Sequence, residues 1–317
     1  MTLRKIHKSF VTDRTPLVVA VFLFILFRFI GANEEDSVVV LWSTAAIQLA
    51  TAFLLLYLIQ TFVIIRNRTF LPASFYLLFT GTIPDLYSDL SGSVSAVCFL
   101  LCIFFLFASY LQERSQAHAL NIALVLTLGS LLWAPLLYFF PVFWLGMYQL
   151  RSLNFRSFVA SLLGFVAIYL FAFTWNFHQG TLAVFFQENP DWQALIHIQP
   201  LGFDLWEYLI IGFLAALFFL SGGSIFVSSV SEKIKTITAL RFLYIVCALV
   251  FILLLLQNDW KKEWFSILCV PLSLLATHLF ALTEKTVIRW LMLVAILFFL
   301  AMFVLFQLNS NDFPLRL

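Results

Sequence analysis

The sequence has little charge. Only 11% of its 317 residues are Asp, Glu, Lys or Arg, whereas 63% are hydrophobic. Water-soluble domains carry about 25% charged residues, so this composition predicts a membrane protein. The formal net charge is only +2. We therefore expect no nucleic-acid partner, because binding to a polyphosphate backbone requires a strongly basic surface.

The chain also lacks the common catalytic and metal-binding motifs. It contains no phosphate-binding P-loop, no GxSxG, no HExxH and no CxxC. Its four cysteines all fall inside apolar runs without the spacing of Cys/His metal ligands, which predicts buried thiols and no metal site. They are Cys98, Cys102, Cys247 and Cys269.

Long apolar runs fill the chain instead. They predict an all-α fold, a polytopic transmembrane helix bundle that forms one integral membrane domain over residues 1–317, with about eleven spans, some of them short or broken. The expected spans are residues 16–27, 38–65, 69–83, 94–110, 119–131, 133–150, 158–174, 205–230, 240–256, 264–282 and 290–308. We expect the first span to remain uncleaved; a signal peptide is the alternative.

The third span is too short to cross a bilayer as a straight helix. Residues 69–83 would reach roughly 22 Å, against a hydrocarbon core of about 30 Å. Pro72 and Pro84 bound the segment, and Asp85 and Asp89 follow it. We predict that this segment, like residues 119–131, is short or tilted and packed inside the bundle.

Residues 119–150 form a single apolar block of 32 residues. One helix would place Arg114 and Arg151 on opposite sides of a membrane, whereas a hairpin keeps both on the cytoplasmic side. A break near Gly129 and Pro135 therefore predicts two helices, and Pro141 is expected to kink the second.

The basic residues predict the orientation. With eleven spans, 14 of the 18 Lys and Arg residues fall on one side, which the positive-inside rule makes the cytoplasm. The N-terminus is then cytoplasmic and the C-terminus periplasmic. The longest outer loop, residues 175–203, is expected to hold a short interfacial helix that begins at Asn189-Pro190-Asp191.

Two blocks resemble a known family. Residues 66–80 read RNRTFLPASFYLLFT, and residues 119–164 read ALNIALVLTLGSLLWAPLLYFFPVFWLGMYQLRSLNFRSFVASLLG. They are similar to multi-pass inner-membrane proteins of Bacteroidota that carry a domain of unknown function. The pattern of that family includes Phe-Asn-x-Arg, and here Asn154 and Phe155 stand in the reverse order. The resemblance implies a cell-envelope protein of the inner membrane and brings no known activity and no catalytic residues. The matching positions are Arg68, Leu71, Pro72, Gly129, Ser130, Leu131, Pro135, Asn154, Phe155 and Arg156.

The candidate site lies at the outer surface. Asp85 and Asp89, four residues apart, share a face if the segment is helical, and we take them as candidate catalytic carboxylates; a polar loop that ends a helix is the alternative. Arg28, near the end of the first span, is expected to snorkel outward toward the acidic outer loop. The candidate ligand-binding residues are Arg28, Glu34, Glu35, Asp36, Asp204 and Glu207. A solvated turn at residues 34–36 and favourable first-turn acids at Asp204 and Glu207 are the simpler explanations.

Three functions remain open. The first is action at the outer face of the bacterial inner membrane on a lipid-linked saccharide or another cell-envelope precursor. The second is a non-catalytic scaffold that holds other membrane proteins in an envelope assembly. A transporter is the weaker third, because no span has a charge near its centre. Membrane lipid is an expected partner in every case. No cofactor is indicated; a divalent cation is the alternative if carboxylates are to bind an anionic ligand.

Overall fold

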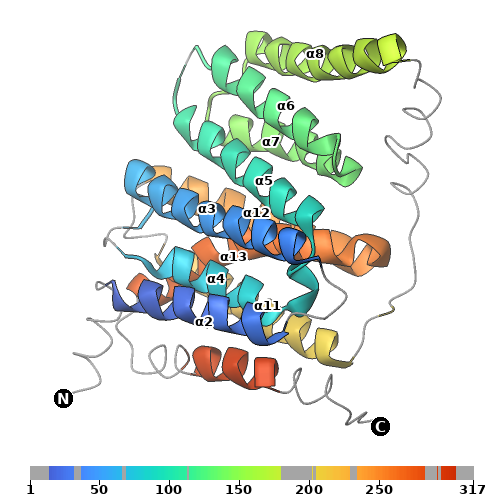
Figure 1. Cartoon of the computed structure of the whole chain (residues 1–317). Helices are drawn as coiled ribbons and strands as arrows, with labels where there is room; N and C mark the ends of the chain where they lie inside the picture. The colour runs from blue at the N-terminus through green and yellow to red at the C-terminus, as the bar shows by residue number, and fades with distance from the viewer. Residues whose placement is uncertain are drawn as a thin grey trace.

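The computed structural model describes residues 14–31, 37–65, 69–112, 114–179, 202, 205–228, 234–282, 291 and 294–304. Every regular element in these residues is helical, which confirms the all-α bundle (Figure 1). The α-helices are α2 (Thr15–Gly31), α3 (Val38–Phe62), α4 (Leu71–Thr82), α5 (Leu90–Ala108), α6 (Gln116–Ser130), α7 (Phe139–Gln149), α8 (Phe155–Gln179), α11 (Leu205–Ser228), α12 (Ile234–Leu256), α13 (Lys261–Leu282) and a last helix, Val294–Val304. Three short 3₁₀ helices connect them: η1 (Pro84–Leu86), η2 (Ala134–Tyr138) and η3 (Asn258–Trp260).

These helices support a membrane location. In the described part of the chain, six of them (α3, α5, α8, α11, α12 and α13) are long and apolar enough to cross a bilayer, while α2 and Val294–Val304 are apolar but shorter. Each of the eleven expected spans overlaps one described α-helix, although several bounds differ; the expected helix at 133–150 is divided into η2 and α7. Whether all eleven cross a membrane remains a prediction.

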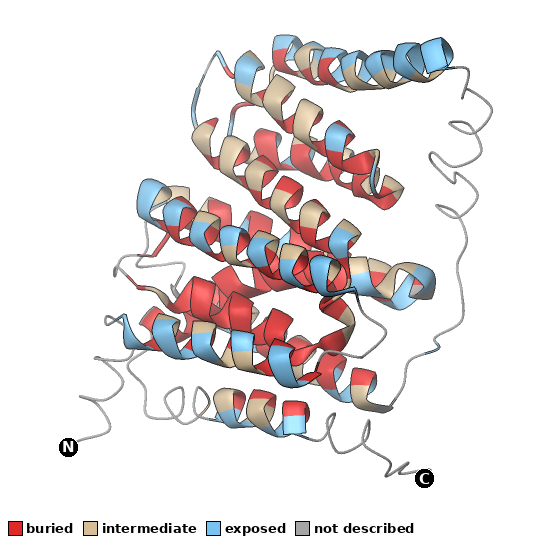
Figure 2. Ribbon diagram, in the orientation of Figure 1, coloured by how far each residue is buried: buried red, intermediate tan, exposed pale blue. Residues whose placement is uncertain are grey.

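The helices pack side by side in a slab whose centre is α13 and α4 (Figures 1 and 2). In the most apolar stretch of α13, 94% of the residues are buried, whereas the corresponding stretch of α8, at one edge, has only 22% of its residues buried. The helix surfaces at the edges expose large apolar side chains such as Phe155 and Phe171. In a membrane, lipid covers such surfaces at no hydrophobic cost.

Helix α4 is the short element that the sequence predicts. Its 12 residues would reach about 18 Å, and all of them are buried. Pro72 occupies the first turn, where its missing N–H costs no intrahelical hydrogen bond. The helix ends before Pro84, and Tyr87 then folds back so that its hydroxyl donates to the carbonyl of Gly81. The prediction of a short, enclosed segment is confirmed here.

The hairpin at residues 119–150 is also confirmed. Helix α6 ends at Ser130, Trp133 is extended, and the chain returns through η2 and α7. The loops at its two ends meet, because Leu111 N donates to Leu150 O (3.2 Å) and the Ser109 and Ser152 hydroxyls are 2.9 Å apart. Arg114 and Arg151 therefore lie at the same end of the bundle.

Two details of this hairpin differ from the predictions. Pro141 lies in the first turn of α7, where it removes no intrahelical bond, so it marks the start of that helix instead of a kink. Helix α6 is short, but Leu128 is 56% exposed, so α6 is not enclosed as α4 is.

The outer loop also differs from the prediction, because residues 175–179 continue α8 and do not belong to that loop. The rest of that loop, with its expected interfacial helix, lies outside the described residues.

The two ends of the bundle differ in charge. Consecutive helices run antiparallel (Figure 1), and Lys235 at the start of α12 lies over the rings of Phe62 and Tyr110, at the ends of α3 and α5. We call this the basic end; its described charges are Arg14, Arg114, Arg151, Arg156, Lys235 and Arg241. All the described carboxylates lie toward the opposite end, the carboxylate end: Asp85, Asp89, Glu207, Asp259 and Glu263.

Candidate functional site

The candidate site lies at the carboxylate end, where α4 stops and the chain turns into α5. Asp85 is half-buried in η1, and Asp89 is the N-cap residue of α5. The bends at Tyr87 and Ser88 separate them, so the two carboxylates do not share the face of one helix as the four-residue spacing predicted. Pro84 and the early end of α4 explain the difference, since the segment is too irregular to keep the helical period.

Asp89 is buried and richly hydrogen-bonded. Its Oδ1 accepts from the backbone N–H of Gly92 (2.8 Å), the capping bond for α5, and from the hydroxyl of Ser91 (3.1 Å). Its Oδ2 accepts from the hydroxyl of Ser266 in α13 (3.0 Å), 177 residues away in the chain. The carboxylate thus joins the start of α5 to the start of α13.

A second carboxylate shares this place. The Ser91 hydroxyl lies 3.0 Å from Oε1 of Glu263 as well as 3.1 Å from Oδ1 of Asp89, so one serine bridges the two acids. Two carboxylates around one hydroxyl disfavour simultaneous ionisation, because like charges repel. Lys262 is exposed and close enough to favour the ionised forms of both acids. We call Asp89 and Glu263, which Ser91 bridges, the acidic pair.

Burial raises the pKa of Asp89 above that of an ordinary aspartate, because desolvation disfavours the charged carboxylate. The hydrogen bonds from Gly92, Ser266 and Ser91, and the charge of Lys262, act in the opposite direction. A carboxyl group with these properties can exchange a proton closer to neutral pH than a solvated one, which is what a general base requires.

Arg28 lies beside this segment, but it does not snorkel outward. The side chain is 1% exposed. Its Nη1 donates to the carbonyl of Leu41 (2.6 Å) and the hydroxyl of Thr44 (2.8 Å), and its Nη2 donates to Oε1 of Gln48 (2.7 Å). Neutral groups of α3 therefore hold the cation, so the expected snorkelling is wrong for this side chain; the acidic loop at residues 34–36 lies outside the described residues.

The Arg28 contacts continue toward the acidic pair. Gln48 donates through Nε2 to the Ser93 hydroxyl (3.0 Å) and to the Leu86 carbonyl (3.2 Å). Ser93 in turn donates its backbone N–H to the carbonyl of Asp89 (3.3 Å). A polar network thus runs from Arg28 through Gln48 and the first turn of α5 to Asp89, so two of the predicted site residues belong to one hydrogen-bonded structure.

Of the remaining predicted residues, the structure describes one and leaves four outside the described residues. Glu207 in α11 is 1% exposed and pairs with Lys261 of α13 at 2.5 Å, so it links two helices. Glu34, Glu35, Asp36 and Asp204 lie outside the described residues.

An aromatic cluster adjoins the acidic pair. Trp264 follows Glu263 directly and contacts Trp133 edge-on, with ring centroids 4.6 Å apart. Tyr138 stacks on Trp264 at 6.4 Å. Both indole N–H groups are buried and have no acceptor among the described residues. Such unpaired donors are uncommon and call for an explanation.

Glu263, Ser266 and Gln48 are not among the residues that the sequence predicts for the site. The signal for Gln48 is local, because Thr44 and Gln48 are polar residues one turn apart within an apolar span. Nothing local marks Glu263 and Ser266 as partners of Asp89, because their contact joins distant parts of the chain.

No group of three or more His, Cys, Asp or Glu side chains converges within the described residues. No protein-family model matches the chain, and no curated protein sequence matches it.

Proposed function

We propose that this protein acts at the outer face of the bacterial inner membrane on a lipid-linked saccharide or another cell-envelope precursor. The observation that carries the proposal is the acidic pair, two carboxylates on one serine, at the end of the bundle that the positive-inside rule predicts to be outside. The resemblance to Bacteroidota envelope proteins is part of the same proposal.

The chemistry of the site suggests a role for each residue. Asp89, with its raised pKa, accepts a proton from a substrate hydroxyl, and Glu263 shares that proton through Ser91. Lys262 offers an exposed cation to a phosphate, which the two acids alone would repel. Arg28 fixes the turn that carries Asp89, because it also contacts the carbonyl of Tyr87 (3.4 Å).

Two further features support a substrate with both sugar and phosphate. The unpaired indole N–H groups of Trp133 and Trp264 are donors that hydroxyl oxygens could satisfy. Asp89 and Glu263 supply oxygen ligands of the kind that a divalent cation prefers. A cation bound there would carry the phosphate, and chelation of the cation would then abolish activity.

A scaffold is the second candidate, and one observation favours it. Asp89, Arg28 and Glu207 all have polar groups engaged in contacts within the bundle. If stability is their only role, the acidic pair holds α5 to α13 and performs no chemistry.

The deciding experiment replaces charge while it keeps shape. Asp89→Asn retains a good N-cap for α5, and Glu263→Gln retains the bond to Ser91. We expect each variant to insert and fold but to lower activity about 100-fold, the size of a lost general base. Asp85→Asn belongs in the same set, and Asp259→Asn, exposed at the same end, is the control. The readout is complementation of a deletion strain together with mass spectrometry of its lipid-linked glycans.

The pH dependence separates the two candidates further. A base works when ionised, so activity should rise with pH through the raised pKa of Asp89, with Glu263 and Lys262 as the charged neighbours that tune it. Lys262→Gln should move that midpoint upward, because it removes a charge that favours ionisation. Full complementation by both Asp89→Asn and Glu263→Gln would instead leave the scaffold as the function.

A further inference from the structure

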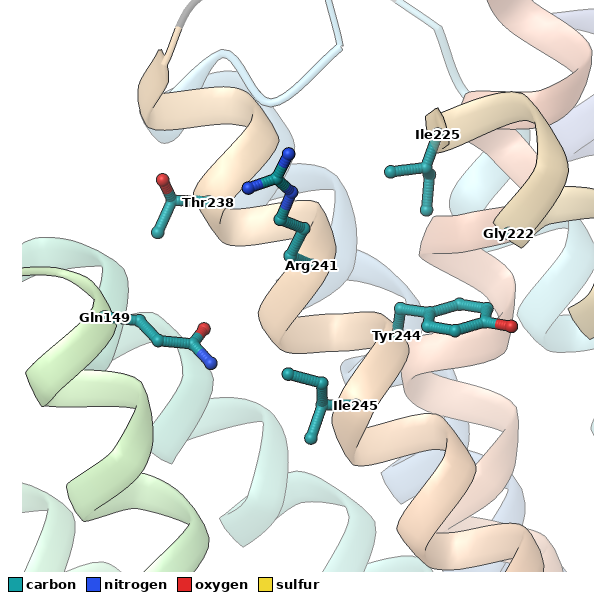
Figure 3. A pocket seen from close by; sticks show the side chains of 7 residues that line it. All are labelled: Gln149, Gly222, Ile225, Thr238, Arg241, Tyr244 and Ile245. Atoms are coloured by element: carbon teal, nitrogen blue, oxygen red, sulfur yellow. The ribbon is translucent and has the colours of Figure 1, made fainter. Parts of the chain in front are cut away.

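A cavity of about 520 Å³ lies toward the basic end, away from the acidic pair. Figure 3 shows it between α7, α11 and α12. Its volume falls in the range of small-molecule sites, about 300–1,000 Å³. The lining residues are Gln149, Gly222, Ile225, Thr238, Arg241, Tyr244 and Ile245.

The walls are apolar and held in place. Tyr244 stacks on Phe218 at 4.3 Å, nearly parallel, and its ring lies against Gly222 (Figure 3). A Cβ at Gly222 would come within 2.6 Å of that ring, so the glycine allows the close approach that shapes the cavity. Ile245, 44% exposed, opens the cavity toward the outside of the bundle. In a membrane, that outside is lipid.

Two polar groups in the lining lack a partner. Arg241 is exposed and forms no ion pair with any described residue. Gln149 has a buried Oε1 that accepts from no donor in the part of the chain that the structure describes. An unpaired cation and an unpaired acceptor, set in apolar walls, match a molecule that carries an anion, a donor and hydrocarbon.

The charges around the cavity favour the same ligand. All the described carboxylates lie toward the other end of the bundle, whereas Arg151 follows Gln149 by two residues and Lys235 precedes Thr238 by three. A positive field at the level of the lipid headgroups attracts anionic lipid.

We propose that this cavity binds one phospholipid of the leaflet at the basic end. The phosphate accepts hydrogen bonds from Arg241, a hydroxyl or ammonium group of the head donates to Gln149, and an acyl chain leaves past Ile245. The site is independent of the acidic pair and of the function proposed for it.

The test measures lipid binding to the purified full chain by native mass spectrometry. The detergent-solubilised protein is delipidated and titrated with phosphatidylglycerol. We expect one tightly bound lipid. Arg241→Gln should weaken that binding tenfold or more, because a charge-assisted hydrogen bond is lost. Arg156→Gln, exposed at the same end but outside the cavity, is the matched control and should bind as the natural chain does.

A second variant tests the cavity by filling it. Thr238 is half-buried, and its hydroxyl donates to the Ile234 carbonyl of its own helix (2.9 Å), so Thr238→Phe should block the lipid while the fold survives. Ile252→Phe, exposed on the same helix outside the cavity, controls for the added ring. Equal binding by Arg241→Gln and Arg156→Gln, or undiminished binding by Thr238→Phe, overturns the proposal. Complete displacement of the lipid by inorganic phosphate also overturns it, because the site would then recognise phosphate alone.

Discussion

Arg28 shows how a buried charge is accommodated here. Its guanidinium donates to two carbonyls, a hydroxyl and an amide, and stacks between the rings of Phe24 and Tyr87, each with its centroid 5.0 Å away. Among the described residues, dipoles and ring faces stabilise this buried arginine, and no carboxylate pairs with it. Each of these partners should therefore contribute strongly to stability.

His278 is the opposite case. It is 1% exposed in α13, and neither ring nitrogen has a hydrogen-bond partner within the described ranges. A buried polar group without a partner costs about 1–3 kcal/mol. We therefore predict that His278→Leu raises the free energy of unfolding by about 1 kcal/mol, measured by thermal or denaturant unfolding in detergent.

Gln48→Leu is the contrasting variant in that experiment. It removes the acceptor of Arg28 Nη2, so we expect a loss of about 2–3 kcal/mol. If His278→Leu proves as destabilising as Gln48→Leu, the imidazole has a partner under native conditions, and the explanation given for it is wrong.

At the scale of elements, the sequence predicts best what is encoded locally. The short α4 follows from its length and its flanking prolines, and the hairpin of α6 and α7 follows from Gly129 and Pro135 together with the charge on either side. Pro271, inside α13, is a further local signal, because it removes one intrahelical hydrogen bond in the most buried of the long helices.

Contacts between distant elements could not be predicted in the same way. Asp89 and Ser266 meet only because α5 and α13 pack together, and hydrophobic periodicity does not specify which apolar helices are neighbours. The same limitation explains Arg28: its end-of-helix position is compatible with snorkelling or with burial, and Thr44 and Gln48 on the neighbouring α3 decide between them. The two acids of the candidate pair therefore needed the structure.

Packing of α8 gives a prediction at this scale. A Cβ at Gly164 would lie 2.9 Å from Cβ of Ala123 and 3.0 Å from the carbonyl of Leu120, so α8 approaches α6 closely there. Membrane helices associate through such small residues because lipid supplies no hydrophobic driving force. Gly164→Leu should lower the unfolding free energy by about 1–3 kcal/mol, measured as a fall in the thermal midpoint in detergent.

The control is Gly212→Leu in α11. Nothing lies within 4 Å of a Cβ at Gly212, so the same substitution there should leave the midpoint within about 1 °C of the natural chain. Equal shifts for the two variants would show that added bulk, and not the α6–α8 contact, is responsible.

At the scale of the whole molecule, the charges separate along the helix axes. Six described cations and none of the described carboxylates lie at the basic end. The hydrogen bond between the loops near Leu111 and Leu150 fixes the α6–α7 hairpin, so α5 ends and α8 begins at the same end of the bundle. The positive-inside rule then predicts that the basic end is cytoplasmic, with the N-terminus inside and the C-terminus outside.

This orientation can be tested with single cysteines at the two ends. All four native cysteines are buried, so a membrane-impermeant maleimide should label the natural chain poorly in intact cells. We predict that Asp259→Cys, exposed at the carboxylate end, is labelled in intact cells, whereas Arg151→Cys is labelled only after the membrane is permeabilised. Labelling of both in denaturant confirms that each thiol is present. The reverse pattern would place the acidic pair in the cytoplasm, so an outer-face precursor could no longer be its substrate, and the cavity beside Arg241 would then face the outer leaflet.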